Sequence, residues 1–421
     1  MKEHLSQKGK KRILFSAFIT LLNDRLSESI LLPLLPSFIL LYADSASAYG
    51  LLSCTYQLAQ FIASPVIGAQ SDRIGRKPVM LICITGSIIG ISILAFTVLF
   101  DWSQYLYITG SSFPIFLLFI SRLIDGFSGG TAATATTVLA DLSSPEKRAK
   151  TFGLIGVAFG LSFALGNICV LIFAKNTNNN VMVPIIIASI IPIINFILVA
   201  LYLPETKPSS NSINNKEQIS FNPFSQLFKV FKEKRIRKLS LAFFMYFVAF
   251  TGLTNILLYF LRQSLGWTSK ASSGTLVAVG IIAIIVQGLL IGPLVKLFGE
   301  MKLTLSGAGF ILFACFVLIT CPKDNAVANV YLAVSFLAIG AGLITPSLRA
   351  LISRKLDINS QGSILSNLQG MQSLGGVIGA VLAGNIYDQI GPKSPFFAGS
   401  IILLIMVWLI TEGKTAERCI K

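Results

Sequence analysis

Twelve apolar runs, each long enough to cross a lipid bilayer as a helix, dominate this 421-residue chain. A helix needs roughly 20 apolar residues to span the hydrocarbon core. Charged residues make up only 12% of the chain, whereas soluble domains carry roughly a quarter. The pattern therefore predicts an all-α integral membrane protein with twelve transmembrane helices. The runs lie at 12–41, 48–70, 78–100, 113–139, 152–174, 182–203, 239–263, 271–295, 302–321, 328–352, 364–388 and 395–412.

The basic residues are distributed unevenly between the two sides that these spans define. Of the 34 Lys and Arg residues, 27 fall on the termini and on the connecting segments that would share their side, and five fall on the other side. Cytoplasmic loops are enriched in Lys and Arg. We therefore expect a multi-pass protein of the inner (plasma) membrane with both termini in the cytoplasm. The same bias explains the net charge of +16 without a nucleic-acid partner.

Several functional classes lack their usual sequence signals. The six cysteines show no metal-ligand spacing, and the single histidine, His4, lies in the N-terminal tail. No nucleophile–base motif or phosphate-binding loop is present. We expect no enzyme activity, no metal and no cofactor, and partners limited to the lipid bilayer, protons and a small-molecule substrate, with the chain acting as a monomer.

A polar segment and an internal repeat divide the chain. The longest polar stretch is 204–238, and its last part, 221–238, places aromatic and apolar residues at helical spacing among lysines. This part is either an amphipathic helix at the membrane interface or an ordinary solvated connector. Gly68 and Gly75 recur as Gly292 and Gly299, 224 residues later. We predict two six-helix bundles, 1–203 and 239–421, joined by the linker 204–238.

The segment from Gly68 to Leu81 reads Gly-Ala-Gln-Ser-Asp-Arg-Ile-Gly-Arg-Lys-Pro-Val-Met-Leu and resembles the signature loop between helices 2 and 3 of the major facilitator superfamily. One position departs, because Gln70 stands where Leu is usual. The resemblance implies two pseudo-symmetric six-helix bundles, and a loop that contacts helix 11 of the other half and holds one conformation shut. The residues that match this switch loop are Gly68, Asp72, Arg73, Gly75, Arg76 and Lys77.

Further motifs are similar to those of twelve-span drug/proton antiporters, which include tetracycline exporters. Arg122 in the fourth span looks like the embedded arginine of that group's second motif, which is tied to proton coupling, and Asp125 follows one turn later. Pro204-Glu205-Thr-Lys follows the sixth span. In the fifth span, Ser162 and Asn167 stand where Gly and Pro are expected. This departure favours import as the alternative to export.

Ionisable residues lie inside two of the apolar runs. Asp24, Arg25 and Glu28 lie in the first span, and Arg122 and Asp125 in the fourth. Charges in hydrocarbon cost at least a few kcal/mol, so they pair or face a cavity. Two Arg–acid pairs at i, i+3 spacing leave one acid over. We predict that Asp24 or Glu28, with Asp125 as the alternative, binds protons reversibly; the competing interpretation is a static, fully paired network.

Polar residues in the C-terminal spans are neutral, which suggests that they line the substrate cavity. We predict a proton-coupled secondary transporter that exports small amphipathic organic compounds by alternating access. Two alternatives remain: a proton-coupled importer of a nutrient or metallophore, and a non-transporting membrane receptor or scaffold. The predicted cavity residues are Tyr246, Thr254, Asn255, Tyr259, Gln287, Asn367 and Gln372.

Overall fold

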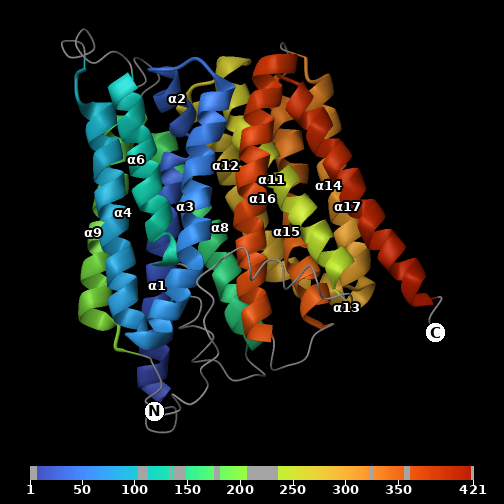
Figure 1. Ribbon diagram of the computed structural model, residues 1–421, viewed down its shortest axis with the longest axis horizontal. Coiled ribbons are helices and arrows are strands. Elements are labelled where there is room, and N and C mark those ends of the chain that lie inside the picture. Colours follow the sequence, from blue (N-terminus) through green and yellow to red (C-terminus); the bar gives the residue numbers. More distant parts are fainter. Residues whose placement is uncertain are drawn as a thin grey trace.

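The computed structural model describes residues 7–102, 112–131, 134–135, 148–174, 181–205, 236–322, 326–354 and 361–418. All regular structure within these ranges is helical, and the helices run roughly parallel or antiparallel to one another (Figure 1). Residues 206–235 of the linker predicted at 204–238, which include most of its amphipathic segment, lie outside the described residues. Within the described ranges, eight helical segments are long and apolar enough to cross a membrane by length and composition, and one of them is the continuous run Ser269–Phe298.

The N-terminal half contains seven named helices, of which the first two together form one predicted span. Pro33 separates them, because proline has no N–H and disfavours a helical residue before it. The helices are α1 (Gln7–Leu31), α2 (Leu35–Leu40), α3 (Ala46–Arg73), α4 (Arg76–Leu99), α6 (Ser112–Ser128), α8 (Arg148–Phe173) and α9 (Met182–Tyr202).

The C-terminal half begins with α11, and one of its spans is built from three helical pieces in sequence. In that span an α-helix passes through a π-helical segment, η2, before it continues as α13. Such π-helical segments often mark functional sites. The elements are α11 (Arg237–Gln263), α12 (Ser269–Ala283), η2 (Ile284–Leu290), α13 (Ile291–Phe298), α14 (Glu300–Thr320), α15 (Ala326–Arg354), α16 (Gln361–Ile390) and α17 (Ser394–Arg418).

Helix packing separates into two groups that meet along two seams. Within the N-terminal half, α1 packs on α8 and α9, and α6 packs on α3 and α4; within the C-terminal half, α14 packs on α15, and α11 on α16 and α17. The halves meet where α3 packs on α16 and where α8 packs on α12. This arrangement has the two bundles expected of the fold class.

Glycines bring the helix backbones into close contact at both seams. A Cβ on Gly50 of α3 would lie 2.5 Å from the carbonyl oxygen of Ala380 in α16, and one on Gly280 of α12 would lie 2.6 Å from the backbone nitrogen of Ala164 in α8. Small residues permit this approach in membrane helices. The seams therefore depend on having no side chain at these positions.

The two turns that carry the internal repeat have similar geometry. Gly75 joins α3 to α4 with φ of 112°, and Gly299 joins α13 to α14 with φ of 77°. Positive φ is costly for residues with a Cβ. The repeated glycine thus performs the same conformational task in both halves.

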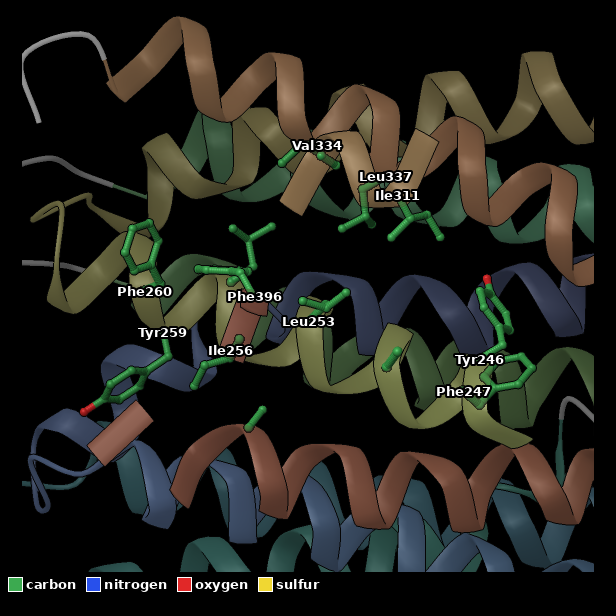
Figure 2. Packing of buried hydrophobic residues seen from close by; sticks show 14 of the residues in the cluster. Tyr246, Phe247, Leu253, Ile256, Tyr259, Phe260, Ile311, Val334, Leu337 and Phe396 are labelled. Atoms are coloured by element: carbon green, nitrogen blue, oxygen red, sulfur yellow. The ribbon is translucent and has the colours of Figure 1, made fainter. Parts of the chain in front are cut away.

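Aromatic and aliphatic side chains of α11 form much of the core of the C-terminal half. Figure 2 shows Phe260 of α11 beside Phe396 of α17, and their rings meet edge to face with centroids 5.4 Å apart. The same view places Tyr246 and Tyr259 toward opposite ends of α11. Their positions in the sequence put them about 20 Å apart along the helix axis.

Candidate functional site

The charged residues of α1 form a compact ion-pair group. Arg25 Nε lies 3.4 Å from Asp24 Oδ2, and Arg25 Nη1 donates to Glu28 Oε2. The guanidinium group also lies 5.2 Å from the ring centroid of Phe159 on α8. Arg25 therefore pairs with two carboxylates, and the ion pair expected between Arg25 and Glu28 is present.

The second group lies on α6 and is more deeply buried. Arg122 is 4% exposed and Asp125 is 8% exposed, and Arg122 Nη2 lies 3.4 Å from Asp125 Oδ2. The Arg122 guanidinium also lies 5.9 Å from the ring centroid of Tyr56 on α3. The i, i+3 pair predicted from the sequence is therefore present, inside the N-terminal bundle.

A cavity of about 20 Å³ connects these two groups. Asp24 and Glu28 of α1 and Asp125 of α6 all contribute to its wall. A buried water needs roughly 10–15 Å³, so the cavity holds about one particle of that size. The three acids predicted for proton binding thus share one small polar site. Its other lining residues are Ser27, Tyr56, Ile84, Ser87, Ile91, Gly129, Pro192 and Asn195.

Helix α9 supports α1 at this site through a proline. Pro192 lies inside α9 and has no N–H to offer Ala188, four residues earlier. Ser27 Oγ donates to the Ala188 carbonyl oxygen at 2.7 Å. On the same helix, Asn195 Nδ2 donates to the Thr20 carbonyl oxygen of α1 at 3.4 Å. Both contacts fix the depth and rotation of α1, and hence the position of its carboxylates.

The departures in the fifth span have a structural role that is not evident from the sequence. Ser162 Oγ on α8 donates to Leu22 O of α1 at 2.9 Å, and Ser29 Oγ of α1 donates to Ser162 O at 2.8 Å. Asn167 is fully buried and donates to Phe163 O at 2.8 Å. Ser162 therefore holds α8 against the charged segment of α1.

The switch loop is held by a carboxylate from its own half. Glu205 Oε1 accepts from the backbone N–H of Arg76 at 2.9 Å, and Glu205 Oε2 accepts from that of Lys77 at 3.2 Å. The first turn of a helix has unsatisfied N–H groups and a partial positive charge, so a carboxylate stabilises it there. Lys77 Nζ donates to Ala200 O at 2.7 Å, and Arg76 Nη1 donates to Ser71 Oγ.

The remaining predicted loop residues behave differently from one another. Arg73 is exposed at the end of α3, and a Cβ on Gly68 would meet nothing within 4 Å. The side chain of Asp72 lies outside the described part of the chain, so its predicted contact with the other half stays a prediction. Gly75 carries the turn, and an added Cβ there would overlap the Glu205 carboxylate.

The predicted substrate residues do not form one cluster. Tyr246 Oη lies 3.0 Å from Thr345 Oγ1. Gln287 of η2 lies against Gly156 of α8, since a Cβ added to Gly156 would be 3.5 Å from Gln287 Oε1. Tyr259 stacks on Tyr49 with centroids 5.6 Å apart. Of these residues, Gln287 lies on the α8–α12 seam, Tyr246 inside the C-terminal half, and Tyr259 in an aromatic contact between the halves.

Two other predicted cavity residues, Thr254 and Asn255, lie on α11. Thr254 Oγ1 donates to Phe250 O of its own helix at 2.8 Å, and Asn255 is half-buried on α11. The Asn367 side chain lies outside the described residues. None of these placements tests the predicted role in substrate binding.

Arg349 is a cation of the C-terminal half that falls inside the predicted span 328–352, near its end. The structure places it inside α15, where Arg349 Nη2 donates to Gln372 Oε1 of α16 at 2.7 Å. Its guanidinium lies 6.0 Å from the ring centroid of Phe243. The helix continues to Arg354, just beyond the end of the predicted span.

Polar contacts join the halves at the end of the bundle away from the start of α1 and the end of α17, hereafter the distal end. Ser37 Oγ lies 3.0 Å from Ser269 Oγ, and Gln263 Nε2 donates to Asp44 Oδ1 at 2.9 Å. Asp388 accepts from the first residues of α3. These contacts hold the two halves together at the distal end.

The chain belongs to the Major Facilitator Superfamily. The family model matches residues 14–366, and the bundle architecture agrees with that assignment. It is a multi-pass membrane protein and a secondary transporter, not an enzyme. Family members work as single-chain units on small-molecule substrates.

Curated relatives and solved structures match nearly the whole chain. Tetracycline resistance protein, class B, of Escherichia coli is 27% identical over 96% of this chain and 97% of its own. Major facilitator superfamily domain-containing protein 10 of Mus musculus is 25% identical over 96% and 94%. The crystal structure of the human organic anion transporter MFSD10 (TETRAN) has a TM-score of 0.69 at 24% identity, covering 95% and 99%. That of the nucleoside transporter NupG has a TM-score of 0.71 at 15% identity, covering 96% and 98%.

Proposed function

We propose that this transporter exports small organic compounds across the plasma membrane in exchange for protons. The observation that carries the proposal is the cavity shared by Asp24, Glu28 and Asp125. Three carboxylates and two guanidinium groups leave one acid without a full counter-charge in a buried site, and protonation of that acid removes the excess charge. The tetracycline resistance relatives support export, and so does their coverage of nearly the full chain.

Proton binding would act on the bundle through α1. The helix that carries Asp24 and Glu28 is bonded to α8 through Ser162, and α8 forms one of the two seams with α12. Neutralising Asp24 or Glu28 would weaken its ion pair with Arg25 and change the packing of α1 on α8. A local charge change of this kind biases an equilibrium between two bundle arrangements.

The distribution of Lys and Arg indicates which side of the membrane the described conformation would open to. With the termini in the cytoplasm, as the distribution of Lys and Arg predicts, the distal end faces outward and is closed. The cytoplasmic side would then exchange substrate in this state. Residues proposed to contact substrate are those of the C-terminal half near α15 and α16, including Gln372 beside Arg349.

Everted membrane vesicles test this function. An imposed pH gradient, acidic inside, is expected to drive accumulation of a transported compound from a panel of amphipathic organic compounds, tetracyclines and organic anions among them. Vesicles without the protein provide the control. Accumulation that is independent of the pH gradient would contradict proton exchange, and uptake into intact cells would favour the importer instead. Absence of flux for every compound would favour a receptor or scaffold.

A further inference from the structure

The cavity beside the intramembrane acids has an uneven charge distribution. Every charged residue in its wall is a carboxylate, namely Asp24, Glu28 and Asp125. The two arginines that pair with these acids, Arg25 and Arg122, do not contribute to the wall. Anything that enters the cavity therefore meets negative charge and neutral oxygen atoms, which favours a cation in a low-dielectric site.

Asn195 of α9 supplies an independent sign of a missing ligand. Its side chain is 2% exposed and lines the cavity. The amide nitrogen donates to Thr20 O at 3.4 Å, while the amide oxygen is buried without a hydrogen-bond partner. A buried oxygen left in this state costs roughly 1–3 kcal/mol. A bound cation or a water molecule would satisfy it.

The number of acids and arginines in the predicted spans of the N-terminal half indicates the charge of a cation that would balance them. Beyond Arg12, the six predicted spans of the N-terminal half contain three acids and two arginines, which leaves one negative charge when all are ionised. One monovalent cation balances it. Among the described residues, no group of three or more His, Cys, Asp or Glu could hold a metal ion, so a cation in this cavity needs neutral oxygen ligands beside a carboxylate.

We propose that this cavity binds one alkali-metal cation of the size of Na⁺, with charge from the carboxylates and a neutral oxygen from Asn195. The hydroxyl oxygens of Ser27, Tyr56 and Ser87 in the same wall are further neutral ligands. The volume of about 20 Å³ admits one particle of water size, which excludes a hydrated ion. This site rests on the proposed function in one respect: Na⁺ and the coupling proton compete for the same carboxylates.

Thermal unfolding of the purified full-length protein in detergent tests the site. NaCl is titrated against choline chloride at constant ionic strength, because choline is too large for the cavity. Na⁺ is expected to raise the midpoint of unfolding in a saturable way, with weaker apparent affinity at lower pH. Asn195→Ala is expected to weaken Na⁺ affinity about tenfold, which corresponds to about 1.4 kcal/mol. Asn195→Asp, which keeps an oxygen, is expected to retain Na⁺ binding.

Ser189→Ala provides the matched control, since Ser189 lies on the same helix and donates to Ile185 O within it. It is expected to bind Na⁺ as the unsubstituted protein does. A Na⁺ response equal to that of choline would show that the cavity holds water alone, and a Na⁺ response unchanged in Asn195→Ala would show that Na⁺ binds elsewhere. Either result would overturn the site.

The two proposals fail separately. If vesicles in Na⁺-free choline buffer move substrate with the pH gradient while no Na⁺ effect on unfolding exists, the cation site is wrong and proton exchange stands. If Na⁺ binds with the expected dependence on Asn195 while no gradient drives substrate, the cation site stands and the proposed exchange is wrong.

Discussion

Asp388 at the end of α16 caps the first turn of α3, where its Oδ1 accepts a hydrogen bond from the backbone N–H of Ala46 at 3.0 Å. Its Oδ2 accepts from the backbone N–H of Ser47 at 2.8 Å and from Ser45 Oγ at 2.9 Å. A carboxylate of one half thus satisfies the unpaired N–H groups of a helix in the other half. This contact joins the two halves at the distal end.

Asp388→Asn is therefore expected to weaken closure of the distal end. Hydrogen bonds to a charged group contribute about 1.5–3 kcal/mol, so the closed population relative to the open one should fall by roughly tenfold or more. The measurement is disulfide formation between cysteines introduced at Ser47 and Asn385, whose side chains are 3.1 Å apart. The yield should fall in Asp388→Asn.

Thr55→Ala is the control for that experiment, because Thr55 Oγ1 bonds only to Leu51 O in the part of the chain described and both residues lie on α3. It should leave the disulfide yield unchanged. Equal yields in Asp388→Asn and in the parent double-cysteine protein would contradict a role for the Asp388 contact in closure.

The switch loop allows a comparison of two of its glycines, Gly68 and Gly75. Gly75→Ala places a Cβ at φ of 112° and against the Glu205 carboxylate, whereas Gly68→Ala meets nothing within 4 Å. We expect Gly75→Ala to destabilise the protein by about 1–3 kcal/mol and Gly68→Ala to have a much smaller effect. Thermal unfolding in detergent measures both; equal midpoints would show that the turn tolerates a side chain.

The α8–α12 seam predicts a conformational effect of a single methyl group. A Cβ on Gly280 would lie 2.6 Å from Ala164 N and 2.8 Å from Gly160 O, so Gly280→Ala forces the helices apart. Gly309→Ala on α14 has open space and serves as the control. The same Ser47–Asn385 disulfide assay should report a lower yield for Gly280→Ala alone. An unchanged yield would mean that the seam adjusts without opening the distal end.

The spans were predictable because each depends on local sequence, and the division into two bundles was predictable from the internal repeat. About 20 apolar residues make a span, and repeated Gly75 and Gly299 make equivalent turns. The ion pairs Arg25–Glu28 and Arg122–Asp125 were predictable from i, i+3 spacing alone. Such features need no knowledge of which helices are neighbours.

Features that depend on helix neighbours were not found from the sequence. Asn195 is a single amide in an apolar run, and only the contact of α9 with α1 places it at the acids. Glu205 was noted as part of a motif, but its role as the cap of α4 follows from the position of α9 beside α4.

The most direct test of proton coupling separates it from substrate movement in Asp24→Asn, Glu28→Gln and Asp125→Asn. Everted vesicles are assayed for accumulation driven by a pH gradient and for exchange of labelled against unlabelled substrate without a gradient. At least one of the three substitutions is expected to abolish gradient-driven accumulation while exchange continues. Retention of gradient-driven accumulation in all three would contradict proton coupling through the acids of α1 and α6.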